Sequence, residues 1–197
     1  MGKKTTELIE QIVQEHNRLS SELTSQSDII ESVSEMVTGT GTSGGTVYIC
    51  GNGGSAADAQ HIVSELVGKF RRDRAGLAAV AITTDSSVMT SIANDYGYEY
   101  VMRRQVEALA KKNDLLWAIS TSGASKNIIE AAKAAKDKGI GVIGFTGKKG
   151  SELEELSDLC FCVESEQTAR TQEIHQIAYH IVCELVEQNI VNSGYTG

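Results

Sequence analysis

The amino-acid sequence predicts an α/β protein, a three-layer sandwich in which a five-stranded parallel sheet lies between helices. Two observations predict this class. Short apolar, β-branched runs alternate with helical patterns along most of the chain, and that order favours a parallel sheet of the flavodoxin-like kind with right-handed crossovers. The length, 197 residues, suits one domain with a full core. We therefore expect a single domain over residues 1–197, of which residues 1–40 form an N-terminal helical extension.

The individual elements follow from local hydrophobic patterns. Runs that are apolar and β-branched predict strands at residues 46–50, 78–82, 115–119, 141–145 and 159–163. Helical periodicity predicts helices from residue 56 and at residues 88–93, 100–110, 126–138, 152–156 and 168–189. The last helix is long and has no partner strand.

The chain before the first strand carries two helical patterns, within residues 5–37, where apolar residues recur at helical spacing. No crossover of their own covers these helices, so we expect them to pack on neighbouring subunits. The alternative is that they cover one face of their own domain. Residues 39–45, GTGTSGG, predict a flexible link into the first strand.

Composition excludes several classes of function. The net charge of −8 disfavours general binding to nucleic acids or anionic membranes. The first residues lack the apolar core of a signal peptide, and no run approaches the length of a membrane span. The four cysteines lack zinc-ribbon spacing and fall in buried elements. We expect reduced thiols and a cytoplasmic protein.

A glycine-rich loop, Gly51-Asn52-Gly53-Gly54-Ser55, follows the first strand. Its glycines allow positive φ and a close approach to a ligand. We expect Ser55 to cap the helix that begins at Ala56, where free N–H groups and the helix dipole suit an anion. The alternative is a tight turn with no ligand.

Within that helix, His61 and Glu65 stand four residues apart and therefore share one face. An imidazole and a carboxylate in this arrangement hold one metal ion or act as a proton-transfer pair. The alternative is a solvated surface contact.

A second polar loop follows the third strand, Ser120-Thr121-Ser122-Gly123-Ala124-Ser125, with Ser125 placed to cap the next helix. In parallel sheets ligands bind at the carboxyl ends of the strands, near the switch in strand order. Four hydroxyls at a helix N-terminus favour a phosphate cradle, and the alternative is a capping cluster without a ligand. Residues 146–150 predict a plain turn, and residues 69–74 a solvated connector.

The final helix places Gln172, Gln176 and His180 along one stripe and His175 on another. Gln172 and His180 are about 80° apart around the helix axis at an advance of about 100° per residue. They can therefore face one ion, whereas His175 should not join them. A lone histidine such as His180 would by itself indicate a structural role.

Four segments together resemble the sugar isomerase (SIS) family and, within it, the phosphoheptose isomerases. They are GNGGSAADAQH-x3-E, AND, STSGAS and ARTQEIH-x4-H, and the resemblance covers essentially the whole chain. It implies homotetramers with sites near subunit interfaces. One departure is Ala169, where some relatives carry an acidic residue, and this leaves an auxiliary acid–base role there unfilled.

The resemblance also implies a site. It implies one zinc ion per subunit, held by His61, Glu65, Gln172 and His180. It implies that the substrate is bound by Asn52, Gly53, Gly54, Glu65, Asn94, Asp95, Ser120, Thr121, Ser122, Ser125 and Gln172. We assign Glu65 as the catalytic base and His180 as the group that returns or relays a proton.

The implied reaction converts sedoheptulose 7-phosphate into D-glycero-D-manno-heptose 7-phosphate through an enediol, for heptose and surface-polysaccharide biosynthesis. The alternative comes from relatives that are not enzymes but tetrameric adaptors for a DNA-replication initiator protein. Those adaptors tend to lose the residue matching Glu65 or His180, and this chain keeps both. An SIS isomerase of another sugar phosphate would keep the phosphate loop without needing the zinc ligands.

Overall fold

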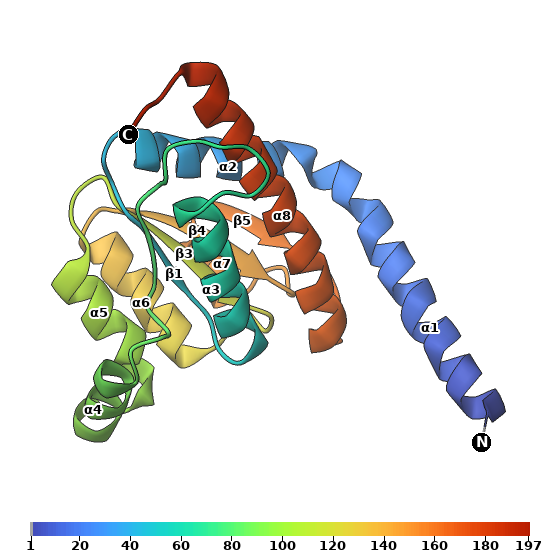
Figure 1. Cartoon of the computed structure of the whole chain (residues 1–197). Coiled ribbons are helices and arrows are strands. Elements are labelled where there is room, and N and C mark those ends of the chain that lie inside the picture. Colours follow the sequence, from blue (N-terminus) through green and yellow to red (C-terminus); the bar gives the residue numbers. More distant parts are fainter. Residues whose placement is uncertain (1) are drawn as a thin grey trace.

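A computed structural model describes residues 2–197 and has at its centre a five-stranded, wholly parallel sheet (Figure 1). The strands are β1 Val47–Cys50, β2 Ala79–Ala81, β3 Leu115–Ser120, β4 Gly141–Thr146 and β5 Leu159–Cys162. Their order across the sheet is β2-β1-β3-β4-β5, with every neighbouring pair parallel. The predicted fold class is thus confirmed.

The helices form the outer layers of the sandwich. They are α1 Gly2–Ser21, α2 Ser27–Thr42, α3 Gly54–Val67, α4 Ser86–Tyr96, α5 Val101–Leu109, α6 Lys126–Asp137, α7 Glu152–Leu156 and α8 Thr168–Ser193. Short 3-10 turns, η1 Glu22–Gln26 and η2 Tyr98–Tyr100, precede α2 and α5. In the described part of the chain no helix combines the length and apolar character that crossing a membrane requires.

Two hydrophobic cores lie on the two faces of the sheet. Successive side chains of a strand point to opposite faces, and β1 shows the consequence. Val47 and Ile49 join a core with α2, α3 and α8, whereas Tyr48 and Cys50 join a core with α5 and α6. Both faces are covered, so the central strands are apolar throughout rather than alternating.

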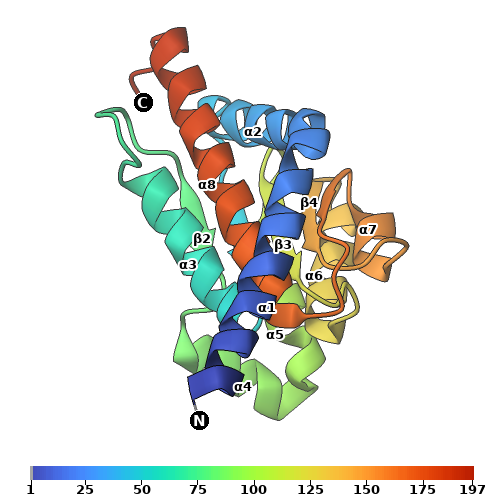
Figure 2. The same ribbon diagram turned by 90° about the vertical axis from the view of Figure 1, so that its right-hand side faces the viewer.

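The two N-terminal helices differ in how they pack. Helix α2 contributes Ile30, Val33 and Val37 to the core shared with α8, so it covers a face of its own domain. Helix α1 contacts α8 but projects beyond the sandwich (Figures 1 and 2) and keeps Leu8 and Ile9 more than half exposed. The expected flexible link at residues 39–45 is wrong in its first half, because α2 continues to Thr42.

The sheet has a switch point between β1 and β3. From β1 the chain passes to β2 on one side, and from β3 it continues through β4 and β5 on the other. The loops after β1 and β3 therefore open side by side at the carboxyl edge, where such sheets bind ligands. Those loops are GNGGS and STSGAS.

Candidate active site

The glycine loop after β1 runs directly into α3. Gly53 has φ of +54°, a conformation that favours glycine, and it lets the helix begin at Gly54. The expected cap at Ser55 is therefore wrong, because Ser55 lies inside the first turn and is buried. Asn52 and Asn127 exchange two side-chain hydrogen bonds of 2.8 Å, which tie this loop to the start of α6 across the switch point.

Three predicted site residues meet where α3 and α8 lie side by side (Figure 2). His61 Nε2 is 3.2 Å from Glu65 Oε1 and 3.5 Å from His180 Nε2. We call these three residues the α3–α8 cluster. The other ring nitrogen of His61 lies 3.1 Å from the Tyr179 hydroxyl. That contact holds the ring so that Nε2 faces the other two members of the cluster.

Two aromatic rings, those of Phe70 and Tyr179, pack against the histidines of the cluster. The rings of Phe70 and His180 are stacked 5.7 Å apart, and Tyr179 packs edge-on against both histidines of the cluster. Burial lowers the pKa of His180, and the nearby His61 lowers it further. A neutral imidazole can both accept a proton and bind a metal ion. The lowered pKa of His180 favours this neutral form.

Phe70 lies in the connector at residues 69–74, which the sequence predicts to be solvated. Lys69, Arg71, Arg72 and Asp73 are indeed exposed, but the connector's backbone is bound to the protein. Glu187, buried in α8, accepts hydrogen bonds from the backbone N–H groups of residues 70–72. The Arg74 side chain is only 2% exposed and donates to the carbonyl oxygens of Leu66, Ala75 and Glu65. The connector is thus fixed against α3 and α8.

Gln172 lies near the α3–α8 cluster but is engaged elsewhere. Its Nε2 donates to Asp58 Oδ2 at 3.1 Å, and Gln176 Nε2 donates to Asp58 Oδ1 at 3.0 Å. The Gln172 amide also packs against Gly54, where an added Cβ would lie 2.3 Å from it. The structure therefore places Gln172 beside the glycine loop and brings only three of the four predicted zinc ligands together.

His175 lies apart from the cluster, as the helical spacing predicts. It is fully buried on the sheet-facing side of α8, with its ring against Phe145 and Phe161. Its Nε2 donates to the Thr146 carbonyl oxygen at 3.2 Å. Burial lowers the pKa of His175 to about 4.

The hydroxyl loop, residues 120–125, lies beside the glycine loop. Ser120 Oγ is 3.1 Å from Ser125 Oγ and 3.4 Å from Ser122 Oγ. Ser125 occupies the N-cap position of α6, but its hydroxyl makes no capping hydrogen bond there. Its side chain contacts Ser120 instead. Ser125 is therefore the N-cap residue, as predicted, but the predicted capping hydrogen bond is absent.

An open cleft of about 710 Å³ adjoins the hydroxyl loop and is lined by Thr121, Ser122 and the turn at residues 147–149. That turn was predicted to be plain, yet it brings Lys148 and Lys149 to the cleft. Lys149 pairs with Glu164, and both side chains are largely exposed. Glu164 and Glu166 also line the cleft, so carboxylates there offset the charge of the two ammonium groups.

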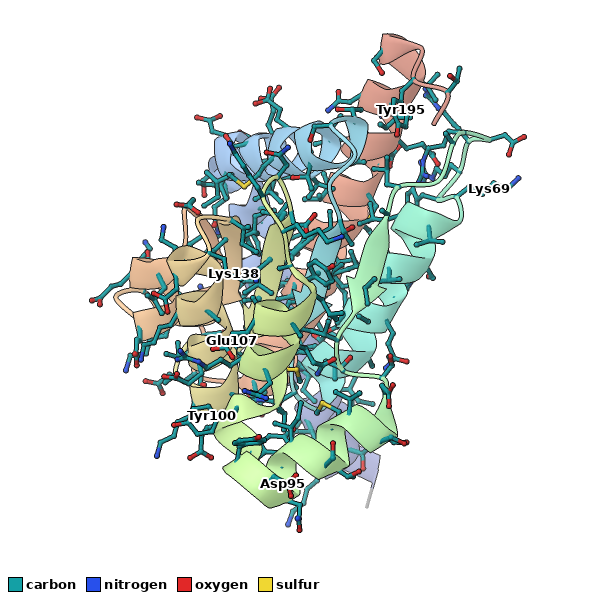
Figure 3. The ribbon with its side chains drawn as sticks, turned by 90° about the vertical axis from the view of Figure 1, so that its left-hand side faces the viewer. Lys69, Asp95, Tyr100, Glu107, Lys138 and Tyr195 are labelled. Atoms are coloured by element: carbon teal, nitrogen blue, oxygen red, sulfur yellow. The ribbon has the colours of Figure 1, made fainter. Side chains whose placement is uncertain are left out.

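Asn94 and Asp95 lie on α4 and are exposed, and the hydrogen bond between them joins the two side chains to each other. Asp95 lies at the end of the molecule opposite Lys69 and Tyr195 (Figure 3). Just after α4, the Tyr98 hydroxyl donates to Asn52 Oδ1 at 3.2 Å. The structure thus joins this segment to the glycine loop through Tyr98 rather than through Asn94 or Asp95.

The donors of the α3–α8 cluster fit zinc in chemical type, because imidazole nitrogens and a carboxylate are ordinary zinc ligands. Among residues 2–197, however, no group of three or more His, Cys, Asp or Glu side chains is arranged to hold an ion as it stands.

Sequence reasoning missed Asp58, Tyr179 and Asn127. Asp58 carried a local signal, since it stands three residues before His61 and so shares that helical face. Tyr179 and Asn127 carried none, because their roles depend on contacts between distant segments.

A parallel sheet with a glycine loop and a hydroxyl loop at its switch point places this chain among the ligand-binding α/β domains. The SIS domain model matches residues 11–147, and the chain belongs to the SIS domain family.

The relatives within that family are more particular. The chain is 52% identical to the phosphoheptose isomerase of Roseiflexus sp., with 84% of each chain covered. It is 46% identical to that of Campylobacter concisus, covering 92% of this chain and 96% of the relative. The solved phosphoheptose isomerase of Neisseria gonorrhoeae superposes with a TM-score of 0.88 at 37% identity, covering 93% of this chain and 99% of that one.

Proposed function

We propose that this protein is an aldose–ketose isomerase that converts sedoheptulose 7-phosphate into D-glycero-D-manno-heptose 7-phosphate. The observation that carries the proposal is the meeting of His61, Glu65 and His180 where α3, the helix that follows the glycine loop, packs against α8. The phosphoheptose isomerases to which the chain is similar over most of its length support the same substrate.

The residues divide the reaction between them. The carboxylate of Glu65, 17% exposed, takes a proton from C1 of the open-chain ketose while the oxygen on C2 gains one, which gives the enediol. A proton then returns to C2, the oxygen on C1 loses its proton, and the aldose forms. His180 relays these protons, which suits an imidazole held neutral by burial.

The loops bind the two ends of the substrate. The hydroxyls of Ser120, Thr121, Ser122 and Ser125 hold the phosphate at the start of α6, where the helix dipole favours an anion. Asn52, Gly53 and Gly54 approach the sugar, with Asn94 and Asp95 at its far side. Fixing both ends holds C1 and C2 near Glu65.

One zinc ion per subunit belongs to the proposal, held by His61, Glu65, Gln172 and His180. When bound, zinc would polarise the sugar oxygens and stabilise the developing negative charge. Glutamine is an unusual zinc ligand, and Gln172 donates a hydrogen bond to Asp58. The ion is therefore expected to be held weakly or to bind together with substrate.

An assay with sedoheptulose 7-phosphate tests this proposal. We expect strong chelation to lower turnover and added zinc to restore it. His180→Ala should lose both turnover and zinc by elemental analysis, whereas His175→Gln, a histidine change on the same helix, should keep both. Normal turnover and stoichiometric zinc in His180→Ala would refute the metal-isomerase proposal.

The adaptor alternative gains no support from these relatives, which are named as isomerases. A sugar-phosphate isomerase for another substrate remains the closer competitor. The same assay distinguishes it, because such an enzyme would act on a different sugar phosphate and would not require zinc.

We propose a homotetramer on the basis of α1. Its apolar face, which includes Leu8, Ile9, Ile12 and Val13, is exposed in the single chain, and a second copy would cover it. Deleting residues 1–21 should give smaller species by light scattering and should lower turnover. A truncated protein that stays tetrameric would show that the rest of the domain makes the interface.

The proposed setting is the cytoplasm, in the supply of heptose for surface polysaccharide. All four cysteines are free thiols, which supports a reducing compartment. The net charge of −8 supports a small phosphorylated sugar, rather than a nucleic acid or an anionic membrane surface, as the partner.

A further inference from the structure

Asp58 is a carboxylate buried between α3 and α8, and the proposed reaction gives it no role. It is 2% exposed, and its two oxygens accept from the side-chain amides of Gln172 and Gln176. A buried carboxylate is costly unless hydrogen bonds satisfy it. Two amide donors from α8 do so here, one on each oxygen.

The carboxylate decides which way the Gln172 amide faces. An ionised carboxylate has only acceptors, so it takes the NH₂ end of the amide and turns the oxygen away. Gly54 holds the other side, since the Gln172 amide lies where a Cβ of that residue would be. Among the described residues no protein hydrogen bond engages Gln172 Oε1, and this oxygen is the only atom of a glutamine side chain that binds a metal ion well.

We propose that Asp58 is a positioning residue that fixes the Gln172 amide with its oxygen outward. This inference rests on the proposed function and adds to it a group that orients one of the proposed zinc ligands from behind. Groups that orient metal ligands from behind typically change metal affinity by about 10–100-fold when removed.

The test measures zinc binding by calorimetry on the full-length protein after its metal has been stripped, together with kcat and KM. Asp58→Asn is nearly isosteric but offers only one acceptor oxygen, so it must turn one of the amides. We expect zinc binding at least about tenfold weaker and a lower kcat, with KM little changed. Gln176→Ala is the matched control, because it removes a bond to Asp58 without touching a site residue, and its zinc affinity should stay within about threefold of wild type.

A double-mutant cycle shows whether Asp58 acts through Gln172. In a Gln172→Ala background, Asp58→Asn should have a clearly smaller effect on zinc affinity than in wild type. Equal effects in both backgrounds would overturn this route, and unchanged zinc affinity with unchanged kcat in Asp58→Asn alone would overturn the whole inference.

Two other results would change how the test is read: failure of Asp58→Asn to fold, and turnover of the wild-type protein without zinc. If Asp58→Asn does not fold, Asp58→Ser decides, because it removes the carboxylate that holds the Gln172 amide and leaves a smaller polar side chain. Weaker zinc binding then supports the inference and unchanged binding overturns it. If wild-type protein turns over without zinc, the metal proposal fails. The role of Asp58 is then judged on kcat alone, which Asp58→Asn lowers if Asp58 positions the site and leaves unchanged if it does not.

Discussion

The α3–α8 cluster and the hydroxyl loop are built in different ways. The cluster takes side chains from two helices that are far apart in the sequence and braces them with Tyr179, next to Asp58. The hydroxyl loop is six consecutive residues whose hydroxyls contact one another. The proposed function thus places the proton transfers on side chains fixed by two helices, and phosphate binding on a loop at a helix N-terminus.

The largest effect should come from Glu65→Gln, which removes the base and keeps the shape. We expect kcat to fall by about a thousandfold or more, within the range for general-base catalysis, while sugar phosphate still binds. Turnover followed by NMR and binding followed by calorimetry check this. Glu184→Gln, which changes an α8 carboxylate paired with Arg71 at the surface, is the control and should leave both quantities unchanged. Full activity in Glu65→Gln would show that Glu65 is not the catalytic base.

The next largest effect concerns stability and the buried face of α8. This face carries His175, whereas His180 lies on another face of the same helix. The pKa of His175 is about 4 in the folded protein, against 6.5 for an ordinary histidine. In the unfolded chain His175 therefore binds a proton below about pH 6.5, whereas in the native protein it binds one only below about pH 4. This contribution to stability is complete above pH 6.5 and is lost as the pH falls, by up to about 3 kcal/mol.

His175→Gln removes that titration and keeps a donor for the Thr146 carbonyl oxygen. Chemical denaturation at pH 7 and at pH 4.5 should show wild type losing more stability than the variant. Equal losses would mean that the ring is already reached by water and protons. His16→Gln, a histidine change at the α1–α8 contact, checks that removing a histidine elsewhere does not give the same result.

Much of the fold could be predicted from the sequence, because strand and helix patterns are local. Each predicted strand agrees with the structure to within about one residue at either end. The Ser55 cap was wrong because Gly53, at positive φ, lets α3 begin earlier than the polar cap suggested. The connector at residues 69–74 is solvated in most of its side chains, as predicted, but the sequence did not indicate that Glu187, far along the chain, accepts hydrogen bonds from its backbone N–H groups.

Some parts of the candidate site could be predicted from local sequence and others could not. The hydroxyl loop is contiguous, so its residues could be predicted as a set. Membership of the α3–α8 cluster could be predicted only through a resemblance, and the placing of Gln172 against Asp58 depends on how two distant helices pack. Sequence spacing shows which residues share a helical face, but not which neighbour that face meets.

The smallest effect should come from the hydroxyl loop, because its work is shared among several groups. Ser120→Ala removes one hydroxyl from a set of four, and neutral hydrogen bonds are worth about 1 kcal/mol each. We therefore expect KM to rise about fivefold, with kcat within about twofold, and zinc affinity unchanged because the loop touches no proposed ligand. Ser157→Ala is the control, since that hydroxyl donates to the Leu153 carbonyl oxygen away from the loop. A fall in kcat as large as that of Glu65→Gln would show that the loop takes part in proton transfer, and the division of labour between helices and loop would be wrong.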